Sequence, residues 1–455
     1  MSSFLRTLLT FALTTCCLWV AAQRAQRLDY RINSVYEERE PTPSPDGRTL
    51  YFWRRESPSN TGGVYDPGDI WFSRRDASGQ WQAAQSIGQP LNTAGHEFVL
   101  QASLRQDTLW LCQTAPGVKE VGFSYSVRTR EGYWSRPVAA HIRNFRYEGN
   151  YKDFFITRDG YLLLPNETEN GMGGSDLFVC YPINDTTWGP PVNLGPAVNG
   201  PGDEDAPCLS ADGLTLYFNS NGHSGYGNHD VFMSRRLDNS WRNWSMPVNL
   251  GAPVNTAGYD FDFFLSADGK SAFWCSDYNS YGSNDIYLMD ATDCQADIYE
   301  VGKAEPLSGS EKNVCYGQTV LLEAGFSPGT YLRYQWLKDG AALPNATERR
   351  LRVSEPGRYQ VVRRRDNCQD SSAAVLVRYV DRPVAEIENA GDVLCLDDSV
   401  ELRSNPVRGL SYQWQLNGLD IPGAEKSYYY VKSPGEYSLR VSNGSCDDVS
   451  EALNL

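Results

Sequence analysis

The chain has 455 residues, a formal net charge of −15 and 21% charged residues. An acidic chain lacks the basic surface that nonspecific nucleic-acid binding requires, so we expect no nucleic-acid partner. The 40 glycines, 27 tyrosines and 12 tryptophans, together with the low charge content, favour an all-β protein rich in turns. A chain of this length is expected to form two or three domains.

Residues 1–22 have the pattern of a cleavable secretory signal peptide. An apolar run from Leu8 to Val20 ends in small residues, as signal cleavage requires. A lipoprotein N-terminus acylated at Cys16 or Cys17 is the alternative. No later stretch approaches the roughly 20 consecutive apolar residues of a membrane helix. We therefore predict an exported protein without a transmembrane segment, located in the periplasm, at the outer membrane or outside the cell.

Residues 28–294 contain a turn of the form Ser-x-Asp-Gly, or a close variant, that recurs about every 55 residues. This interval suits the four-stranded blade of a β-propeller, whose usual repeat is roughly 40 to 50 residues. One degenerate copy lies at Ser103 to Gln106. The aspartates of the other four turns, to which we assign a structural role, are Asp46, Asp159, Asp212 and Asp268.

A tryptophan, an asparagine and an acidic residue recur in fixed register between the turns. Trp81, Trp188 and Trp244 are each followed by Asn at +11 and by an acid at +16. The last repeat lacks this segment, but Asn33 stands five residues before Glu38 near the start of the chain. We therefore predict that residues 28–40 form the final strand of the last blade and close a ring of five blades, which removes exposed sheet edges.

Two further sets of acidic residues recur in the blades. Members of the first set precede a short apolar strand and are expected to hydrogen-bond turn amides; they are Asp69, Asp176, Asp230 and Asp285. Members of the second set begin the innermost strands and form a candidate binding mouth for a basic segment or a cation; they are Glu38, Glu97, Glu204 and Asp260. Capping of the loops between blades is the alternative role of the second set.

At these motifs residues 28–294 resemble the PD40 or TolB-like propeller repeats, which are WD40-like. The phrase Trp-x-x-Pro-Val-Asn-Leu-Gly is similar to the version in cell-envelope proteins of gliding bacteria with type IX secretion. The resemblance implies a propeller, and it implies little about function because propellers host many unrelated activities. Since nothing in the sequence resembles an OmpA-type module, a cell-wall anchor is not implied.

Residues 300–380 and 383–455 read as two immunoglobulin-like β-sandwich modules. Spacings from Trp to Gly, Gly to Tyr and Tyr to Cys are 4, 19 and 9 residues in both copies, and the Pro-Gly-x-Tyr phrases resemble a tyrosine corner. We predict one disulfide in each module, Cys315 with Cys368 and Cys395 with Cys446, each worth roughly 4 kcal/mol. The other five cysteines are odd in number, so at least one is free or paired elsewhere: Cys112, Cys180, Cys208, Cys275 and Cys294.

Motifs that carry chemistry are weak in this sequence. None of the four histidines lies in a His-Glu-x-x-His pattern, although His223 and His229 share one Gly-rich loop. The segment Gly222 to Tyr226 lacks the second glycine of a nucleophile elbow. We therefore predict no catalytic residue, no metal and no cofactor.

Two functions from different classes remain. The first is a non-enzymatic envelope or secreted scaffold that binds another protein in a secretion, gliding-motility or adhesion assembly. The alternative is glycan binding or glycoside hydrolysis by acidic and aromatic propeller loops, because the separation of paired carboxylates is invisible in sequence. A converging pair of carboxylates flanked by aromatic side chains in a propeller mouth would favour the sugar.

Overall fold

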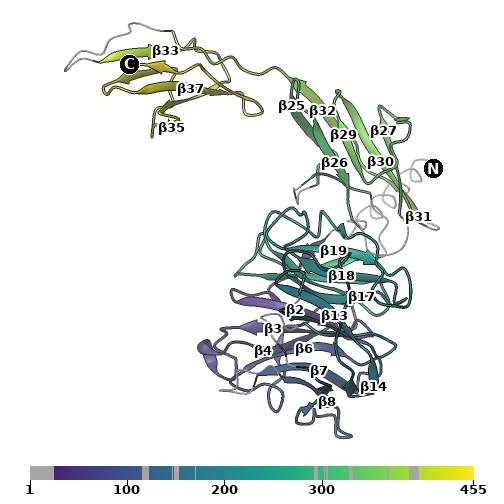
Figure 1. Cartoon of the computed structure of the whole chain (residues 1–455). Coiled ribbons are helices and arrows are strands. Elements are labelled where there is room, and N and C mark those ends of the chain that lie inside the picture. The colour runs from purple at the N-terminus through teal and green to yellow at the C-terminus, as the bar shows by residue number, and fades with distance from the viewer. Residues whose placement is uncertain are drawn as a thin grey trace, which may run out of the picture. The chain divides into compact units, whose positions relative to one another are not determined.

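The structure of the protein is a computed structural model, which describes residues 25–114, 122–145, 147, 153–169, 171–291, 296–301, 303, 306–326, 332–365, 368–388 and 399–455 (Figure 1). Regular structure in these residues is β, apart from one 3-10 turn, η1 (Gly63–Tyr65). None of the described segments forms a helix with the length and apolar character that a membrane span requires. The predicted signal peptide lies outside the described residues.

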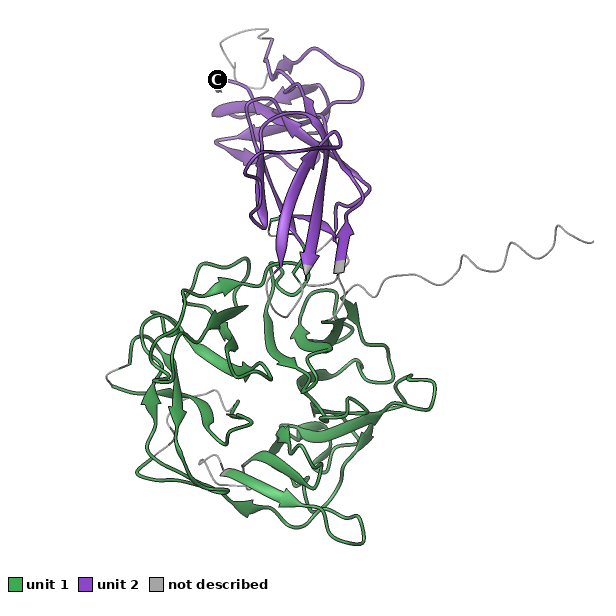
Figure 2. Ribbon diagram, turned by 90° about the vertical axis from the view of Figure 1, so that its right-hand side faces the viewer, with its two compact units in different colours: residues 1–295, 301–305, 325–331 green, residues 296–300, 306–324, 332–455 purple. Residues whose placement is uncertain are grey.

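Two compact units make up the chain (Figure 2). The first, residues 1–295 with 301–305 and 325–331, contains five four-stranded antiparallel sheets arranged around one axis. The first strands of these sheets line the central channel. The chain is thus a five-bladed β-propeller followed by two immunoglobulin-like modules, as the sequence predicts.

Each blade is named here by its strands from the channel outward. Blade 1 contains β2 (Glu37–Pro43), β3 (Thr49–Arg55), β4 (Asp69–Arg74) and β5 (Gln85–Ser86). Blade 2 contains β6 (His96–Ala102), β7 (Thr108–Thr114), β8 (Gly122–Val127) and β9 (Val138–Ala139). Blade 3 contains β11 (Phe155–Ile156), β12 (Leu162–Glu167), β13 (Ser175–Cys180) and β16 (Val192–Asn193). A small sheet of β10 (His141–Ile142), β15 (Thr187–Trp188) and β14 (Pro182–Asn184) is separate from these blades.

The remaining two blades complete the ring. Blade 4 contains β17 (Glu204–Leu209), β18 (Thr215–Ser220), β19 (Asp230–Arg235) and β20 (Val248–Asn249). Blade 5 contains β21 (Asp260–Leu265), β22 (Ser271–Ser276), β23 (Asp285–Asp290) and, from the other end of the chain, β1 (Gln26–Arg27).

Closure of the ring by the N-terminal segment is confirmed, but the closing strand is shorter and earlier than predicted. Strand β1 pairs antiparallel with β23, with Gln26 opposite Leu288. The predicted range of 28–40 is wrong because the chain turns after Asp29, whose carbonyl accepts the Asn33 N–H at 2.9 Å, and then enters blade 1.

The recurring asparagine explains how consecutive segments hold together. The Asn33 side chain donates to the Ile286 carbonyl at 2.9 Å and accepts the Ile286 N–H at 2.8 Å. An asparagine amide offers one acceptor and two donors, so it pairs with a strand residue as a backbone unit would. The same two bonds recur in three other blades, for Asn92 with Ile70, Asn199 with Leu177, and Asn255 with Val231.

Apolar side chains between the blades form the propeller core. Trp188, Trp241 and Trp274 are among its largest fully buried residues. Four of the five propeller cysteines are buried, where they pack as small apolar groups: Cys112, Cys180, Cys208 and Cys275. Cys294 lies outside the described residues.

The second unit, residues 296–300, 306–324 and 332–455, contains the two sandwich modules. In the first, one sheet contains β24 (Ile298–Glu300), β26 (Val320–Ala324) and β29 (Arg350–Val353). Its other sheet contains β25 (Glu311–Cys315), β32 (Val375–Val380), β30 (Gly357–Arg365), β27 (Arg333–Lys338), β28 (Ala341–Ala342) and β31 (Cys368–Ser371).

The second module repeats this plan with fewer strands. One sheet pairs β33 (Val400–Arg403) with β36 (Tyr428–Val431). The other contains β35 (Leu419–Asp420), β34 (Ser411–Leu416), β37 (Glu436–Ser442), β38 (Asp447–Val449) and β39 (Leu453–Asn454).

Matched residues take matched positions in the two modules. Trp336 and Trp414 are fully buried. The hydroxyls of Tyr359 and Tyr437 each donate to the carbonyl four residues earlier at 2.9 Å, which is the tyrosine corner of such sandwiches.

The predicted disulfide pairing is wrong for Cys315 and Cys446, which bond to each other across 131 residues with Cα atoms 5.8 Å apart. Cys315 ends β25 opposite Val380, the last residue of β32, and β32 leads into the second module. Cys446 lies in the turn after β37, where Asn443 donates to the carbonyl of Asp381 at 2.9 Å. The bridge therefore ties one module to the next. The side chains of Cys368 and Cys395 lie outside the described residues.

Candidate functional site

Strained bulges interrupt the channel-lining strands at two acidic residues. The pairing register shifts between Arg39 and Thr42 in β2 and between Phe261 and Phe264 in β21. Within these bulges Glu40 and Asp262 both have φ of 55°. Positive φ is uncommon for residues other than glycine, and bulges re-aim side chains next to functional sites. The backbone is thus bent at the two positions whose carboxylates face the channel.

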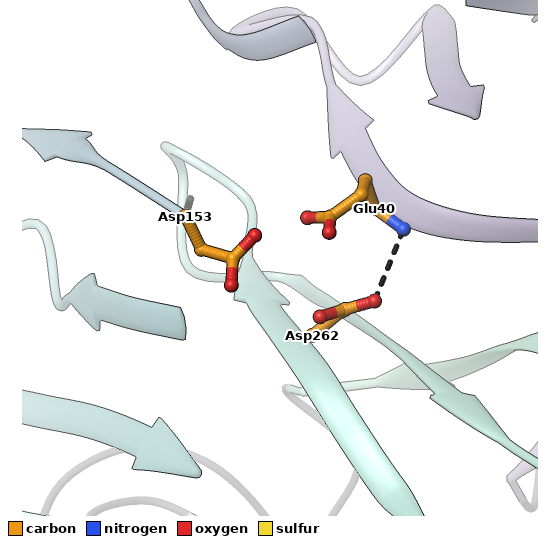
Figure 3. Close-up of side chains that lie close together, drawn as sticks. All are labelled: Glu40, Asp153 and Asp262. Atoms are coloured by element: carbon orange, nitrogen blue, oxygen red, sulfur yellow. Dashed lines mark hydrogen bonds between the residues drawn. The ribbon is translucent and has the colours of Figure 1, made fainter. Parts of the chain in front are cut away.

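Three carboxylates from three blades converge in the channel (Figure 3). Glu40 of blade 1, Asp153 just before blade 3 and Asp262 of blade 5 place carboxylate oxygens within 4.8 Å of one another. Asp262 is 6% exposed and accepts the backbone N–H of Glu40 at 3.2 Å, whereas Glu40 and Asp153 are half-buried. We call these three residues the carboxylate cluster.

One arginine and a fourth acid accompany the carboxylate cluster. The Arg39 Nε lies 3.4 Å from Asp262 Oδ2, and its guanidinium lies 4.3 Å from the centre of the Phe261 ring. Asp205 is buried in β17 and accepts a hydrogen bond from Asn219 at 2.6 Å. Four carboxyl groups therefore share one cationic partner in this part of the channel.

Burial and this excess of negative charge shift the pKa values of several groups in the site. Burial, followed by the charges of Asp153 and Asp262, raises the pKa of Glu40 well above its usual range. Burial and the charge of Asp153 likewise raise the pKa of Asp205. Burial opposes the charge on Arg39, but Asp262 and Glu40 outweigh it and raise the Arg39 pKa. Glu40, whose pKa is raised, thus lies beside Asp262, which pairs with Arg39, so the two carboxyl groups have different surroundings in one site.

The carboxylate cluster also has the donor set of a cation site. Carboxylate oxygens are the ligands that Ca²⁺ and Mg²⁺ prefer. The Oδ1 atom of Asp262 is buried and accepts no hydrogen bond from the described residues. Glu40, Asp153 and Asp262 are the residues that can hold such a cation.

Two cavities meet beside the carboxylate cluster. The cluster lines a cavity of about 30 Å³, which is large enough for an ion or a water. A cavity of about 690 Å³ opens among the Ser-x-Asp-Gly turns, and its wall includes Trp110, Trp188 and Trp241. Phe155 and Phe264, whose ring centres are 6.0 Å apart, line both cavities. These two rings therefore separate the carboxylate cluster from the larger space.

The prediction that four acids form a binding mouth is wrong, because all four side chains are buried. All four are at most 1% exposed, and each accepts the backbone N–H of the residue four positions earlier. The four side chains therefore bond to the loops that lead into their strands. Glu38 also forms a salt bridge with Arg54 at 2.6 Å. The acids that cap loops in this way are Glu38, Glu97, Glu204 and Asp260.

The aspartates predicted to be structural bond to local backbone. Asp46, Asp212 and Asp268 each accept from a serine hydroxyl and from an N–H two residues on. The turn at Asp159 closes through Gly160 N–H and the Thr157 carbonyl at 2.9 Å. The aspartates that precede the apolar strands each accept a hydrogen bond from a loop N–H group. These aspartates are Asp69, Asp176, Asp230 and Asp285.

The two loop histidines have different partners. His223 Nε2 lies 2.8 Å from the Val198 carbonyl, whereas His229 Nε2 lies 3.1 Å from the Asn221 amide. The ring nitrogens of His223 and His229 therefore make separate local contacts and do not meet at one site.

Sequence reasoning missed the carboxylate cluster, although one signal was available. Glu40 and Asp262 each stand two residues after a capping acid, Glu38 and Asp260, and so occupy the same repeat position. Val99 and Ala206 occupy it in two other blades. Asp153 comes from the blade that departs from the register, so no repeat position identifies it.

Comparisons with known proteins concern the fold. No protein-family model matches the chain, and no curated protein matches it in sequence. An α-L-arabinofuranosidase from Lactobacillus brevis is similar over 58% of this chain and 92% of its own, with 11% identity and a TM-score of 0.40. The xyloglucan PUL GH43B of Bacteroides ovatus is similar over 95% and 92%, with 13% identity and a TM-score of 0.38.

The chain is also similar to a solved structure of immunoglobulin domains. Immunoglobulin domains 1–4 of Sidekick-1 are similar over 36% of this chain and 48% of their own, with 14% identity and a TM-score of 0.16. The PD40 or TolB-like resemblance and the link to type IX secretion stay predictions, since no family model matches.

The prediction that the chain is not an enzyme is corrected. Structures similar to it include an arabinofuranosidase. The channel also brings together carboxylates whose separation the sequence could not reveal.

Proposed function

We propose that the propeller is carbohydrate-active and cleaves a glycosidic bond at the carboxylate cluster. The observation that carries this proposal is the convergence of Glu40, Asp153 and Asp262, from three blades, to within 4.8 Å. Glycoside hydrolysis needs a protonated carboxyl group and an ionised one on either side of the scissile bond. The bulge itself recurs in β6 and β17, but the matching residues there are Val99 and Ala206, so the acids Glu40 and Asp262 are particular to two blades.

Glu40 is the proton donor in this proposal. Its pKa is raised well above the usual range, which favours the protonated carboxyl group, and the proton passes to the glycosidic oxygen as the bond to the anomeric carbon breaks. Carboxylate oxygens within 4.8 Å of one another leave no room for a water between the pair, so half-buried Asp153 acts as the nucleophile. It bonds to the anomeric carbon as the bond to the leaving oxygen breaks, and Glu40, ionised once it has given its proton, accepts a proton from the water that hydrolyses this ester. Asp262, which pairs with Arg39, stabilises the positive charge that develops on the sugar.

Substrate enters from the cavity of about 690 Å³. Trp110, the half-buried tryptophan of its wall, suits contact with a saccharide, because binding sites combine apolar surface with a few oriented polar groups. Phe155 and Phe264 must turn aside to admit a sugar ring, since both rings line the two cavities.

Release of reducing ends from a panel of plant, algal and bacterial polysaccharides tests the proposal. We expect hydrolysis of at least one polymer by the full chain and a loss of about 100-fold or more in E40Q and D153N. E169Q is the matched control, because Glu169 is exposed and lines neither of the two cavities. Hydrolysis retained in E40Q, or absent from a folded wild-type chain on every polymer, would contradict the proposal.

One observation favours a second function for the same residues, which is cation binding. The cavity at the carboxylate cluster holds about 30 Å³, and Asp262 Oδ1 accepts no hydrogen bond from the described residues. A bound Ca²⁺ would raise the melting temperature of the wild type and would not do so in E40Q. Ca²⁺-dependent stability without hydrolysis would favour this function over the first.

We also propose that the protein is exported. A disulfide between Cys315 and Cys446 indicates an oxidising compartment outside the cytoplasm, and the apolar run from Leu8 to Val20 supports a signal peptide. An envelope or secreted protein partner remains a prediction from the sequence.

A further inference from the structure

A second cleft lies between blades 1 and 2, away from the carboxylate cluster. It has a volume of about 600 Å³. Its polar walls come from Arg74 at the end of β4 and Arg128 just after β8. Its aromatic walls are Tyr51, Phe72, Tyr133 and Trp134.

The two arginines are available to a ligand. Both are exposed, and within the described part of the chain neither forms a salt bridge. Their guanidinium groups lie 5.0 Å from the Phe72 ring and 5.9 Å from the Trp134 ring. Arg128 Nε also donates to the Gly132 carbonyl at 3.3 Å, which orients the group.

Both arginines line the same cleft as the Tyr51 phenol. Burial raises the pKa of Tyr51, the charges of Arg74 and Arg128 act against that rise, and the charge of Asp46 adds to it. An arginine pair converging on one point binds a carboxylate well, because guanidinium donors match its two oxygens.

The cleft also has a flat apolar side. Tyr133 is 73% exposed and Trp134 is half-buried, so their rings are open to a ligand. Tyr51 and Phe72 pack with ring centres 6.4 Å apart. Gln89 and Gln106 add amide groups that can bond hydroxyls. Cations, ring faces and amides together match a ring that bears both hydroxyls and a carboxylate.

We propose that this cleft is a subsite for an acidic sugar, a uronate unit of a polysaccharide whose carboxylate is bound by Arg74 and Arg128. This inference rests on the proposed function and names its substrate class. The turn from Ser103 to Gln106 connects the two sites, because Ser103 lines the larger channel cavity and Gln106 lines the cleft. One polysaccharide chain can therefore occupy both, which favours a glycan over an acidic peptide.

Calorimetric titration of the full chain with oligogalacturonate tests the proposal. We expect binding that weakens about tenfold in R74Q and again in R128Q, because each substitution removes a charge-assisted contact. R242Q is the matched control, since Arg242 is exposed on blade 4 and outside the cleft. Y133A, at an exposed position, tests the aromatic wall without disturbing the core.

Three outcomes would overturn the proposal. These are equal weakening in R242Q, equal binding of the carboxyl-reduced oligomer, or equal binding of oligoglutamate. Failure of the proposed function has a different signature: E40Q and the wild type would bind the oligomer equally while neither hydrolyses any polymer. Failure of the cleft alone would leave hydrolysis intact in the wild type, with R74Q and R128Q unaffected in binding.

Discussion

Glu40 and Asp262 have their positions because a bulge at the channel wall, which recurs in β2, β6, β17 and β21, carries an acid in two of these strands. With φ of 55°, each backbone stores strain of about 1–3 kcal/mol that regular pairing would avoid. This strain places a carboxyl group where two other carboxylates already lie. Burial of Glu40 and repulsion from these carboxylates together raise its pKa, so the geometry of the site also shifts its titration.

The pH dependence of hydrolysis follows at this scale. Because Glu40 must be protonated, activity should fall as the pH rises through its raised pKa. In D262N one of the charges that raise this pKa is gone, so the basic limb of the kcat/KM profile should move to lower pH. A limb that stays in place, or moves to higher pH, would show that Asp262 does not control Glu40.

Asparagine side chains join the elements of the propeller by hydrogen bonds of the kind that a neighbouring strand would make. Asn33, Asn92, Asn199 and Asn255 each bond both the N–H and the carbonyl of one strand residue. The fixed spacing of asparagine and acid predicted this much of the fold, including closure by the N-terminal segment. Spacing could not predict the bulges, because a bulge is one extra residue whose place depends on the partner strand.

Removing one asparagine should have a large cost. In N255A the buried N–H and carbonyl of Val231 lose their partners, so the free energy of unfolding should fall by about 2–3 kcal/mol. Urea unfolding measures this change. N239A, at an exposed position, should change it by less than about 0.5 kcal/mol. Similar values for the two variants would contradict the role of the asparagine.

Loop-capping acids should make the propeller less stable at higher pH. Burial raises the pKa of Glu97 to about 7 and that of Asp260 to about 7. The folded state therefore holds protons that the unfolded chain has released, and the free energy of unfolding falls as the pH rises from about 4 to about 7. Urea unfolding should give a lower value at pH 8 than at pH 5. In E97Q the difference should shrink, and an unchanged difference would contradict this assignment.

At the scale of the whole molecule, repeats predicted the architecture but not how the modules connect. Matched spacings in the two modules implied matched disulfides, yet Cys315 bonds to Cys446. Cys315 lies beside the strand that leaves its module, and this neighbour is set by the parallel pairing of β25 with β32. Such a pairing between distant segments leaves no trace in local spacing. The carboxylate cluster was missed for the same reason, since its members come from three blades.

The disulfide can be checked directly. Proteolysis without reductant should yield a peptide that joins Cys315 to Cys446. Closing so long a loop stabilises the folded state by roughly 5 kcal/mol in the chain-entropy model, so C315S should lower the melting temperature of the C-terminal unit. A peptide that joins Cys315 to Cys368 would restore the pairing expected from the sequence.

The role of Glu40 as proton donor is tested most directly by comparing leaving groups. The rates to compare are those of wild type and E40Q on two glycosides of one sugar, one with a dinitrophenyl leaving group and one with an alkyl group. A phenolate that leaves without a proton needs no acid, whereas an alkoxide does. We expect E40Q to lose little activity on the first glycoside and about 100-fold or more on the second. Equal losses on both glycosides would contradict the assignment of Glu40 as the acid.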